Sequence, residues 1–566
     1  MRTHLLAALA ILLALTAALL TPPKWWPEGL RQDYYALLGE PVYRPPPPTR
    51  EIDLGDAETP CEDRDRAWRA AQTVDGVPIA ESLLCNPDNP AAVAAFVKGT
   101  NNVSPMTLMD TLLAPDAVVK GNDRDGDGDP DEIHIRLEVA ELNGASPEIA
   151  ESVPGYAIAP GIKPGFWVFA PKTRGMATAS LIDLAANRML RAPSPVIRVE
   201  AGDTVRVTLE NGHYMPHTIH FHGVDHPYVD AEGEGNDGVP QTSEKPVMPG
   251  MSRTYEMTPR QTGTMFYHCH VQPSIHILMG LQGMFVIEEN RPDNPVQTLN
   301  IGAGQVRHRS VHSRAAFDRE YDLHYQDLDK ELHALPGAAN DPRLIIEQAH
   351  RRYDVTERSA DYFILNGRSF PYTFRESVVV VAPDETVKLR VLNGGAEEVA
   401  LHSHGHKIRI SHYDGIEHAP AAQITRDVVQ IAPAQRVDLV LETTNDGLHS
   451  YGEGLWLLHD HHEPAVTNDG LAPGGGITAI AYQSYLDEKG WPRPQGVDWT
   501  PYFTADYYRR ALPVWSPYDP LGLLGEAGAG PAVSLRALLL ALVIGLLAGT
   551  LILLLRPRRP GPDKGQ

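Results

Sequence analysis

Four closely spaced histidine pairs are the residues of this 566-residue chain best suited to chemistry. Two pairs fall in one stretch and two in a later one: His220/His222, His268/His270, His402/His404 and His459/His461. On a β-strand, residues i and i+2 point to the same face, so each pair can aim two imidazoles at one point. Imidazole is a strong ligand for transition metals such as copper and zinc. Eight imidazoles are too many for one ion and suit a cluster of three.

One cysteine lies inside the second of these pairs. Cys269 stands between His268 and His270, and it is one of only three cysteines in the chain. A thiolate beside imidazoles selects copper or zinc, which would explain an odd thiol. The other two, Cys61 and Cys85, either form a disulfide in an oxidising compartment or remain buried free thiols.

These motifs resemble those of two-domain multicopper oxidases of the small-laccase type. Residues 217–223 read HTIHFHG, which matches the HxxHxHG motif of that family, and His268-Cys269-His270 matches its HCH motif. The resemblance covers residues 131 to 488. It implies an all-β fold of two cupredoxin-like Greek-key β-barrels, to which this chain adds an N-terminal extension and hydrophobic segments at both ends.

The resemblance places a type 1, or blue, copper in the first barrel. Its ligands would be His217, Cys269 and His276. The family often has a weak axial methionine after the second histidine, but Leu281 occupies that register here. Met279 and Met284 lie nearby in other registers. A missing axial ligand implies a raised reduction potential.

The resemblance also distributes the remaining histidines over a three-copper cluster. The type 2 copper would take His220 and His402, and the type 3 pair would take six others: His222, His268, His270, His404, His459 and His461. The second barrel has Val399 and Asp460 where a blue site needs histidine and cysteine. His406 and His462 are left outside the ligand set. Asp237 corresponds to a proton-relaying aspartate of the family, although an Asp-Gly turn alone would also explain it.

The implied function is that of a laccase-like oxidase with four coppers per chain. It would oxidise an unidentified external donor one electron at a time and reduce O2 to water. A copper-containing nitrite reductase and a non-enzymatic copper-binding electron carrier are the alternatives. A nitrite reductase lacks the second histidine of the His-Cys-His motif. An electron carrier needs only a blue copper site. Two-domain relatives form homotrimers with clusters between subunits, so we expect a homotrimer. The net charge of −23 argues against a nucleic-acid partner.

The chain is expected to divide into seven parts. The 48 glycines and 49 prolines suit many short strands and turns. A strand-turn-strand pattern at 196–209 recurs at 377–392, as expected for repeated barrels. Residues 131–292 form the first cupredoxin domain, 293–488 a linker plus the second domain, and 489–533 a juxtamembrane segment. Residues 23–130 match no family and are an N-terminal extension of unknown fold.

Both ends of the chain predict membrane targeting. Residues 1–22 read as a signal peptide or a membrane anchor, with cleavage left open. Residues 534–556 are predicted to form a transmembrane helix, since 19 residues from Ala537 to Leu555 carry no charge. Basic residues follow, so the tail 557–566 should be cytoplasmic. The catalytic domains would then lie on the periplasmic or extracellular side of the cytoplasmic membrane.

An acidic run precedes the first barrel. Carboxylates alternate with other residues at Asp123, Asp125, Asp127 and Asp129, and Gly128 lies among them. Such spacing resembles a calcium loop, but position 12 is His134 rather than glutamate. Either the run binds calcium or it is a solvated acidic turn that leads into a strand.

Overall fold

The computed structural model describes residues 116–144, 156–172, 190–292, 298–306, 317–339, 341–487 and 499–509, the helix 535–555, and short pieces elsewhere. The chain divides into two compact units. One is Thr49–Tyr508, and the other combines Met1–Pro48 with Arg509–Gln566. The predicted pair Cys61 and Cys85 lies outside the described residues, and so does the segment that follows the helix 535–555.

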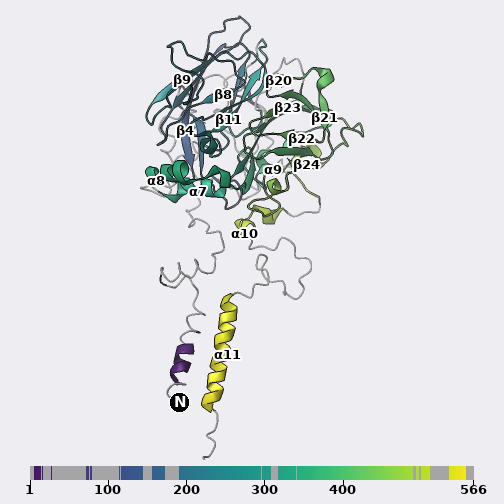
Figure 1. Ribbon diagram of the computed structural model, residues 1–566. Helices are drawn as coiled ribbons and strands as arrows, with labels where there is room; N and C mark the ends of the chain where they lie inside the picture. Colours follow the sequence, from purple (N-terminus) through teal and green to yellow (C-terminus); the bar gives the residue numbers. More distant parts are fainter. Residues whose placement is uncertain are drawn as a thin grey trace, which may run out of the picture. The chain divides into compact units, whose positions relative to one another are not determined.

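Two β-sheets form the first barrel and confirm the predicted cupredoxin-like fold (Figure 1). Alternating apolar residues of the two sheets face each other, as Val205 and Phe285 do, and fill one core. One sheet has the order β3 (Val118–Gly121), β4 (Glu132–Leu142), β7 (Thr204–Glu210) and β9 (Ser252–Met257), with β5 (Phe166–Pro171) beside β4. The other runs β12 (Leu299–Asn300), β6 (Val196–Glu200), β11 (Gln282–Glu288), β10 (Gly263–His268) and β8 (His220–His222). Because β3 pairs with β4, the barrel begins before residue 131.

The second barrel repeats this plan. Its core lies between its two sheets and includes Leu389, Leu439 and Ile480. The larger sheet runs β13 (Gly304–Gln305), β14 (Arg319–Leu328), β17 (Thr386–Asn393), β23 (Arg436–Glu442), β19 (Ile408–Tyr413) and β20 (Ile416–Glu417), joined by β15 (Tyr362–Leu365) and β21 (Ile424–Arg426). The other runs β16 (Val379–Val381), β25 (Thr478–Tyr482), β24 (Leu455–Asp460), β18 (Val399–Ser403) and β22 (Val428–Ile431).

A buried ion-pair network joins the two barrels. Arg198 on β6 contacts Asp322 on β14 at 2.5 Å, and Arg390 on β17 contacts Asp438 at 2.9 Å and Glu288 at 3.2 Å. Apolar side chains on the outer face of β11 pack against β17 beside the network. Buried charges are tolerated only when paired, so this network fixes one relative position of the barrels.

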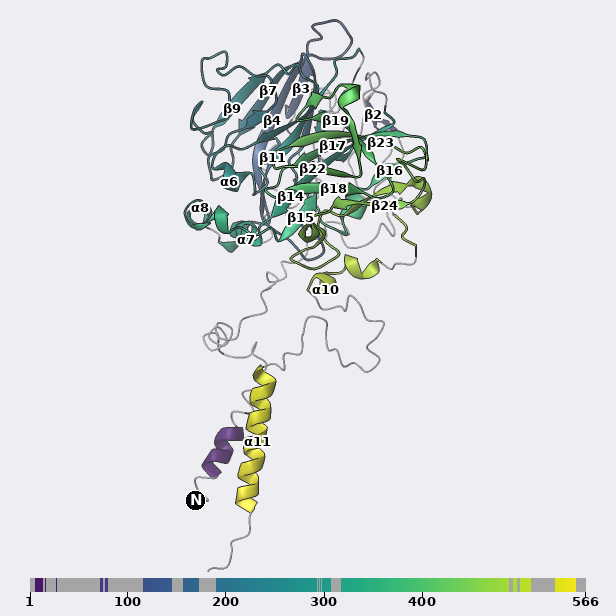
Figure 2. The same ribbon diagram turned by 45° about the vertical axis from the view of Figure 1, so that its right-hand side comes forward.

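A short helical segment between β14 and β15 belongs to the second half of the chain but covers the first barrel. It comprises α7 (Lys330–Ala338), α8 (Pro342–Glu347) and η3 (Gln348–Arg352), a π-helical turn. Leu332, Ile345 and Ala349 are buried in the core of the first barrel. Figure 2 shows α7 and α8 beside α6 (Pro273–His276). No pattern in the sequence predicted this covering segment, which lies within the predicted linker and second domain, residues 293–488.

Residues 499–508 pack against the second barrel. They form the turn η8 (Thr500–Phe503) and the short helix α10 (Ala505–Tyr508). The Trp499 ring lies 4.6 Å from that of Phe374 on α9 (Thr373–Glu376), and Tyr502 lies 5.4 Å from Phe370. This part of the predicted juxtamembrane segment is therefore a clasp on the barrel.

The remaining described elements lie toward the two ends of the chain. Strands β1 (Gln72–Val74) and β2 (Val77–Ile79) form a hairpin in the predicted extension. Residues 6–13 are helical, and α11 (Leu535–Leu555) coincides with the predicted helix 534–556. Across the described residues, no helix satisfies the length and hydropathy required of a membrane span.

Candidate metal centre

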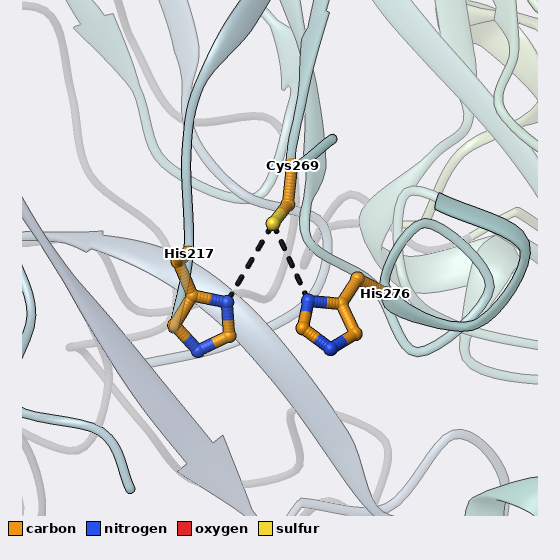
Figure 3. Close-up of side chains that lie close together, drawn as sticks. All are labelled: His217, Cys269 and His276. Atoms are coloured by element: carbon orange, nitrogen blue, oxygen red, sulfur yellow. Dashed lines mark hydrogen bonds between the residues drawn. The ribbon is translucent and has the colours of Figure 1, made fainter. Parts of the chain in front are cut away.

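Three side chains meet in the core of the first barrel as the resemblance implied (Figure 3). Cys269 directly follows β10, His217 precedes β8, and His276 ends α6. The Cys269 Sγ atom lies 3.6 Å from Nδ1 of His217 and 3.3 Å from Nδ1 of His276. All three side chains are 0% exposed. One thiolate and two imidazoles, closed off from water, fit the ligand set of a blue copper.

Burial shapes the protonation of these three groups. Desolvation holds the pKa of both imidazoles well below the usual value, so they are neutral and able to bind a metal. Burial also raises the pKa of the Cys269 thiol to about 12. A thiol in such surroundings is inert until a bound metal displaces its proton.

Leu281, Met279 and Met284, the three residues near the axial position, do not all point in the same direction. Leu281 is fully buried, and its carbonyl oxygen accepts the Cys269 N–H at 3.0 Å. Met279 belongs to the same core. Met284 points from the opposite face of β11 into the cluster of Phe266 and Leu392 between the barrels. Met284 is therefore directed away from the Cys269 site.

Two further histidines contact the Nε2 atoms of His217 and His276, on the sides of the rings that face away from Cys269. His213 Nδ1 lies 2.9 Å from Nε2 of His217, and His350 Nε2 lies 2.9 Å from Nε2 of His276. Such partners fix the tautomer and ring orientation of a ligand histidine. His213 precedes the HxxHxHG motif closely, whereas His350 reaches the site only through the covering segment.

The second metal group of the first barrel stands on the paired strands β8 and β10. His220 lies opposite His268 in this pair, and Nε2 of His222 approaches Nε2 of His268 to 2.9 Å. The His220 Nδ1–H donates to the Asp237 carbonyl oxygen at 2.6 Å, and the His268 Nδ1–H donates to the Cys269 carbonyl at 2.9 Å. With Nδ1 protonated, each Nε2 carries a lone pair that can bind a metal. The ring of His270 lies 5.5 Å from that of His220.

The second barrel builds an equivalent group on β18 and β24. His402 lies opposite His459, and Nε2 of His404 lies 3.2 Å from Nε2 of His459. The His402 and His459 Nδ1–H groups donate to the carbonyl oxygens of Asp427 and Asp460, both at 2.9 Å. Local strand pairing therefore produces the same imidazole arrangement twice.

The two histidine groups are separate and partly open to solvent. Among the described residues, every ring contact of these histidines stays within its own barrel. The His461 side chain is 53% exposed, although ligands of a finished cluster are normally enclosed. Each barrel thus presents half of a site.

The blue-site apparatus is lacking at the matching place in the second barrel. Val399 and Asp460 are both buried there, and Asp460 Oδ1 accepts the N–H groups of Ala400 and His462. His406 is also buried, and it donates Nδ1–H to the His404 carbonyl. His406 therefore supports the backbone at His404, whereas His462 is exposed and contributes only its backbone N–H to Asp460.

The two barrels are similar in sequence to known proteins. Sequence profiles described as multicopper oxidase match residues 185–292 and 336–452. The chain carries two multicopper oxidase domains. An iron transport multicopper oxidase of Gibberella zeae is 28% identical over 318 residues, 51% of this chain and 44% of that protein. A putative laccase of Oryza sativa is 26% identical, and the match covers 44% of this chain and 37% of the relative. The chain thus matches less than half of the length of these relatives.

Solved structures resemble the two multicopper oxidase domains. The blue copper oxidase of Nitrosomonas europaea aligns over 66% of this chain and 92% of its own, with 24% identity and a TM-score of 0.46. The multicopper oxidase mgLAC aligns over 66% and 94%, with 25% identity and a TM-score of 0.45.

Asp237 touches the first-domain histidine group with both its backbone and its side chain. Its Oδ1 lies 3.3 Å from Nδ1 of His220 and 3.2 Å from Nε2 of His226, a residue that the sequence did not single out. The next residue, Gly238, has φ of +77°, and a Cβ there would lie 2.1 Å from the Ile219 carbonyl oxygen. Only glycine lets the chain pass this close, so Gly238 holds Asp237 against His220.

The acidic run forms the connection between β3 and β4 of the first domain. Asp123, Asp125 and Asp127 bring carboxylate oxygens within 4.8 Å of one another. Asp129 is instead buried, and its Oδ2 accepts the Asn294 N–H at 3.1 Å. Three of the four predicted ligands therefore gather, and calcium binding stays a prediction.

Proposed function

We propose that this protein is a membrane-anchored, laccase-like multicopper oxidase that oxidises an external donor and reduces O2 to water. The observation that carries the proposal is the position of Cys269 between His268 and His270. The blue-site thiolate and the half-cluster imidazoles are neighbours in one backbone, which supplies a covalent route between the two sites. Copper bound at these sites would accept single electrons from the donor and deliver four to oxygen.

The protein's own residues prepare the sites for this chemistry. Carbonyl oxygens anchor the Nδ1–H groups of His220, His268, His402 and His459 and direct Nε2 toward the metal. Burial excludes water from Cys269. The Asp237 carboxylate can hold a proton beside His220 and pass it to oxygen-derived products.

Two observations disfavour the alternatives. A nitrite reductase would leave His270 unexplained, and an electron carrier would leave both half-cluster groups unexplained. The second barrel reproduces the imidazole pattern of the first in detail, including the carbonyl anchors. We infer from this repeat that both groups would serve one shared metal cluster.

A homotrimer would complete the clusters. Head-to-tail contacts around a closed ring bring the first barrel of one subunit against the second barrel of the next. Exposed apolar residues support such a contact: Val428, opposite His402, is 37% exposed, and Leu457, two residues before His459, is 38% exposed. These side chains would be buried by the neighbouring subunit.

The test uses the purified, copper-loaded protein. We expect four coppers per chain, a blue absorption from Cys269, and uptake of one O2 for every four electrons drawn from a donor panel. A blue protein that consumes oxygen but releases hydrogen peroxide would contradict the four-electron reaction. A colourless protein would contradict the blue site, whereas a coloured protein with only two coppers per chain would favour the nitrite reductase.

A further inference from the structure

The copper-binding imidazoles of the blue site are completely covered. His217 and His276 are both 0% exposed, and their Nδ1 atoms face Cys269. Their Nε2 edges are the outer ends of the site, and each meets another histidine at 2.9 Å. An external donor therefore cannot touch either ligand ring.

The His217 side is separated from solvent by a buried histidine. His213 is 5% exposed, and its ring lies 3.9 Å from that of Tyr214 and 5.4 Å from that of Trp167. Its free Nε2 faces the buried carboxylate of Glu141 at 3.7 Å. On this side solvent is reached only one residue farther out, at the partly exposed Tyr214, whereas His350 contacts a ligand imidazole directly.

The His276 side ends at the surface. His350 is partly exposed, and its ring lies 5.1 Å from that of His276 with 30° between the planes. Ala349, its neighbour on η3, is fully buried in the first-barrel core and holds the turn in place. Arg351, the next residue, is exposed to solvent. Single π-helical turns of this kind often occur at functional sites.

We propose that His350 is the residue through which electrons enter the blue copper site. Donors would dock on η3 and transfer one electron through the His350 ring and its hydrogen bond to His276. The donor would lose one electron, a copper held by His217, Cys269 and His276 would gain it, and His350 would end unchanged. This inference rests on the proposed oxidase function, but it concerns the entry of electrons alone.

The charge of Arg351 makes the docking place testable. If donors dock beside it, reversing its charge must slow an anionic donor and speed a cationic one. Hexacyanoferrate(II) and hexaammineruthenium(II) are suitable one-electron probes. The experiment mixes the copper-loaded full chain with each probe without oxygen and follows the loss of the blue absorption.

In Arg351→Glu, we expect reduction by hexacyanoferrate(II) to slow about threefold and reduction by hexaammineruthenium(II) to speed up about threefold at low ionic strength. The matched control is Arg206→Glu. The Arg206 side chain is 45% exposed and lies on β7, in the sheet formed by β3, β4, β7 and β9. It should leave the ratio of the two rates unchanged. Equal changes in both variants would overturn the proposal.

His350→Phe should slow both probes by more than its measured change in reduction potential explains. His350→Gln keeps a hydrogen-bonding group and should recover part of the rate. If His350 only positions His276, its substitution would change the reduction potential and the absorption of the blue site but no more. Unchanged reduction rates in His350→Phe would overturn the proposal. A blue protein that is reduced but consumes no oxygen would contradict only the proposed oxidase function. Absence of a blue site would contradict both.

Discussion

His220 and His402 are held in the same way in the two barrels: each donates its Nδ1–H to the backbone carbonyl oxygen of an aspartate, Asp237 or Asp427. Each also stands opposite a histidine of the neighbouring strand. The two residues are thus equivalent positions of a repeat. Their equivalence underlies the assignment of one shared cluster, for which each would supply one type 2 ligand.

Cys269→Ser should remove the blue colour and donor oxidation while the cluster copper remains. A serine hydroxyl is a poor copper ligand and lacks the thiolate that absorbs. Metal analysis should show three coppers per chain instead of four, and a visible spectrum should show no strong band. Loss of all copper would mean that the blue site and the clusters do not assemble independently.

Leu281→Met should lower the reduction potential of the blue copper by supplying an axial ligand. A change of about 60 mV equals about 1.4 kcal/mol for one electron. Met284→Leu is the matched control, because Met284 packs between the barrels and should leave the potential unchanged. Redox titration of the blue band measures both. A potential that moves in Met284→Leu but stays constant in Leu281→Met would refute this assignment.

Asp237→Asn should slow reoxidation by O2 but leave reduction of the blue copper by donor unchanged. The amide keeps the backbone carbonyl that anchors His220 but cannot carry a proton as a carboxylate does. The enzyme is reduced anaerobically and mixed with oxygen, and recovery of the blue colour is followed. Glu232→Gln removes an exposed carboxylate from the same loop and serves as the control. Equal reoxidation rates in the two variants would reduce Asp237 to a turn residue.

Mixing two inactive chains should restore activity if the clusters lie between subunits. His220→Ala and His402→Ala each remove one ligand and should be inactive alone. In a mixed trimer, at least one junction joins an intact first barrel to an intact second barrel. Oxygen uptake by co-expressed chains measures the recovery. No recovery from mixtures shown by mass spectrometry to be trimers would place each cluster within one chain.

Arg390→Met should destabilise the fold by about 3–5 kcal/mol, because it leaves buried carboxylates without their partner. Burial alone would raise the pKa of Glu320, but Arg390 and then Arg198 outweigh it and lower that pKa. A lowered pKa means that this stabilisation is present above the ordinary value of 4.5 and is lost as the pH falls below it. Thermal unfolding should therefore show the largest difference between variant and parent near neutral pH and a smaller one in acid.

The sequence predicted which histidines lie together, because their positions depend on local rules. Pairs of histidines on a strand share a face, and the register of Cys269 between two of them follows directly. His350 could not be foreseen, since it approaches His276 through a helical segment that is 74 residues away in the chain. The short strand β3 was missed for a similar reason: only its pairing with β4 shows that it belongs to the barrel.

The covering segment α7–η3 has a consequence for how this enzyme could be altered. The metal that would receive electrons lies in the first half of the chain, whereas the surface that we propose for donor docking is encoded in the second half. Choice of donor and chemistry of the metal can therefore change independently. Exchanging residues 330–352 alone would let the same copper site accept electrons from different reductants.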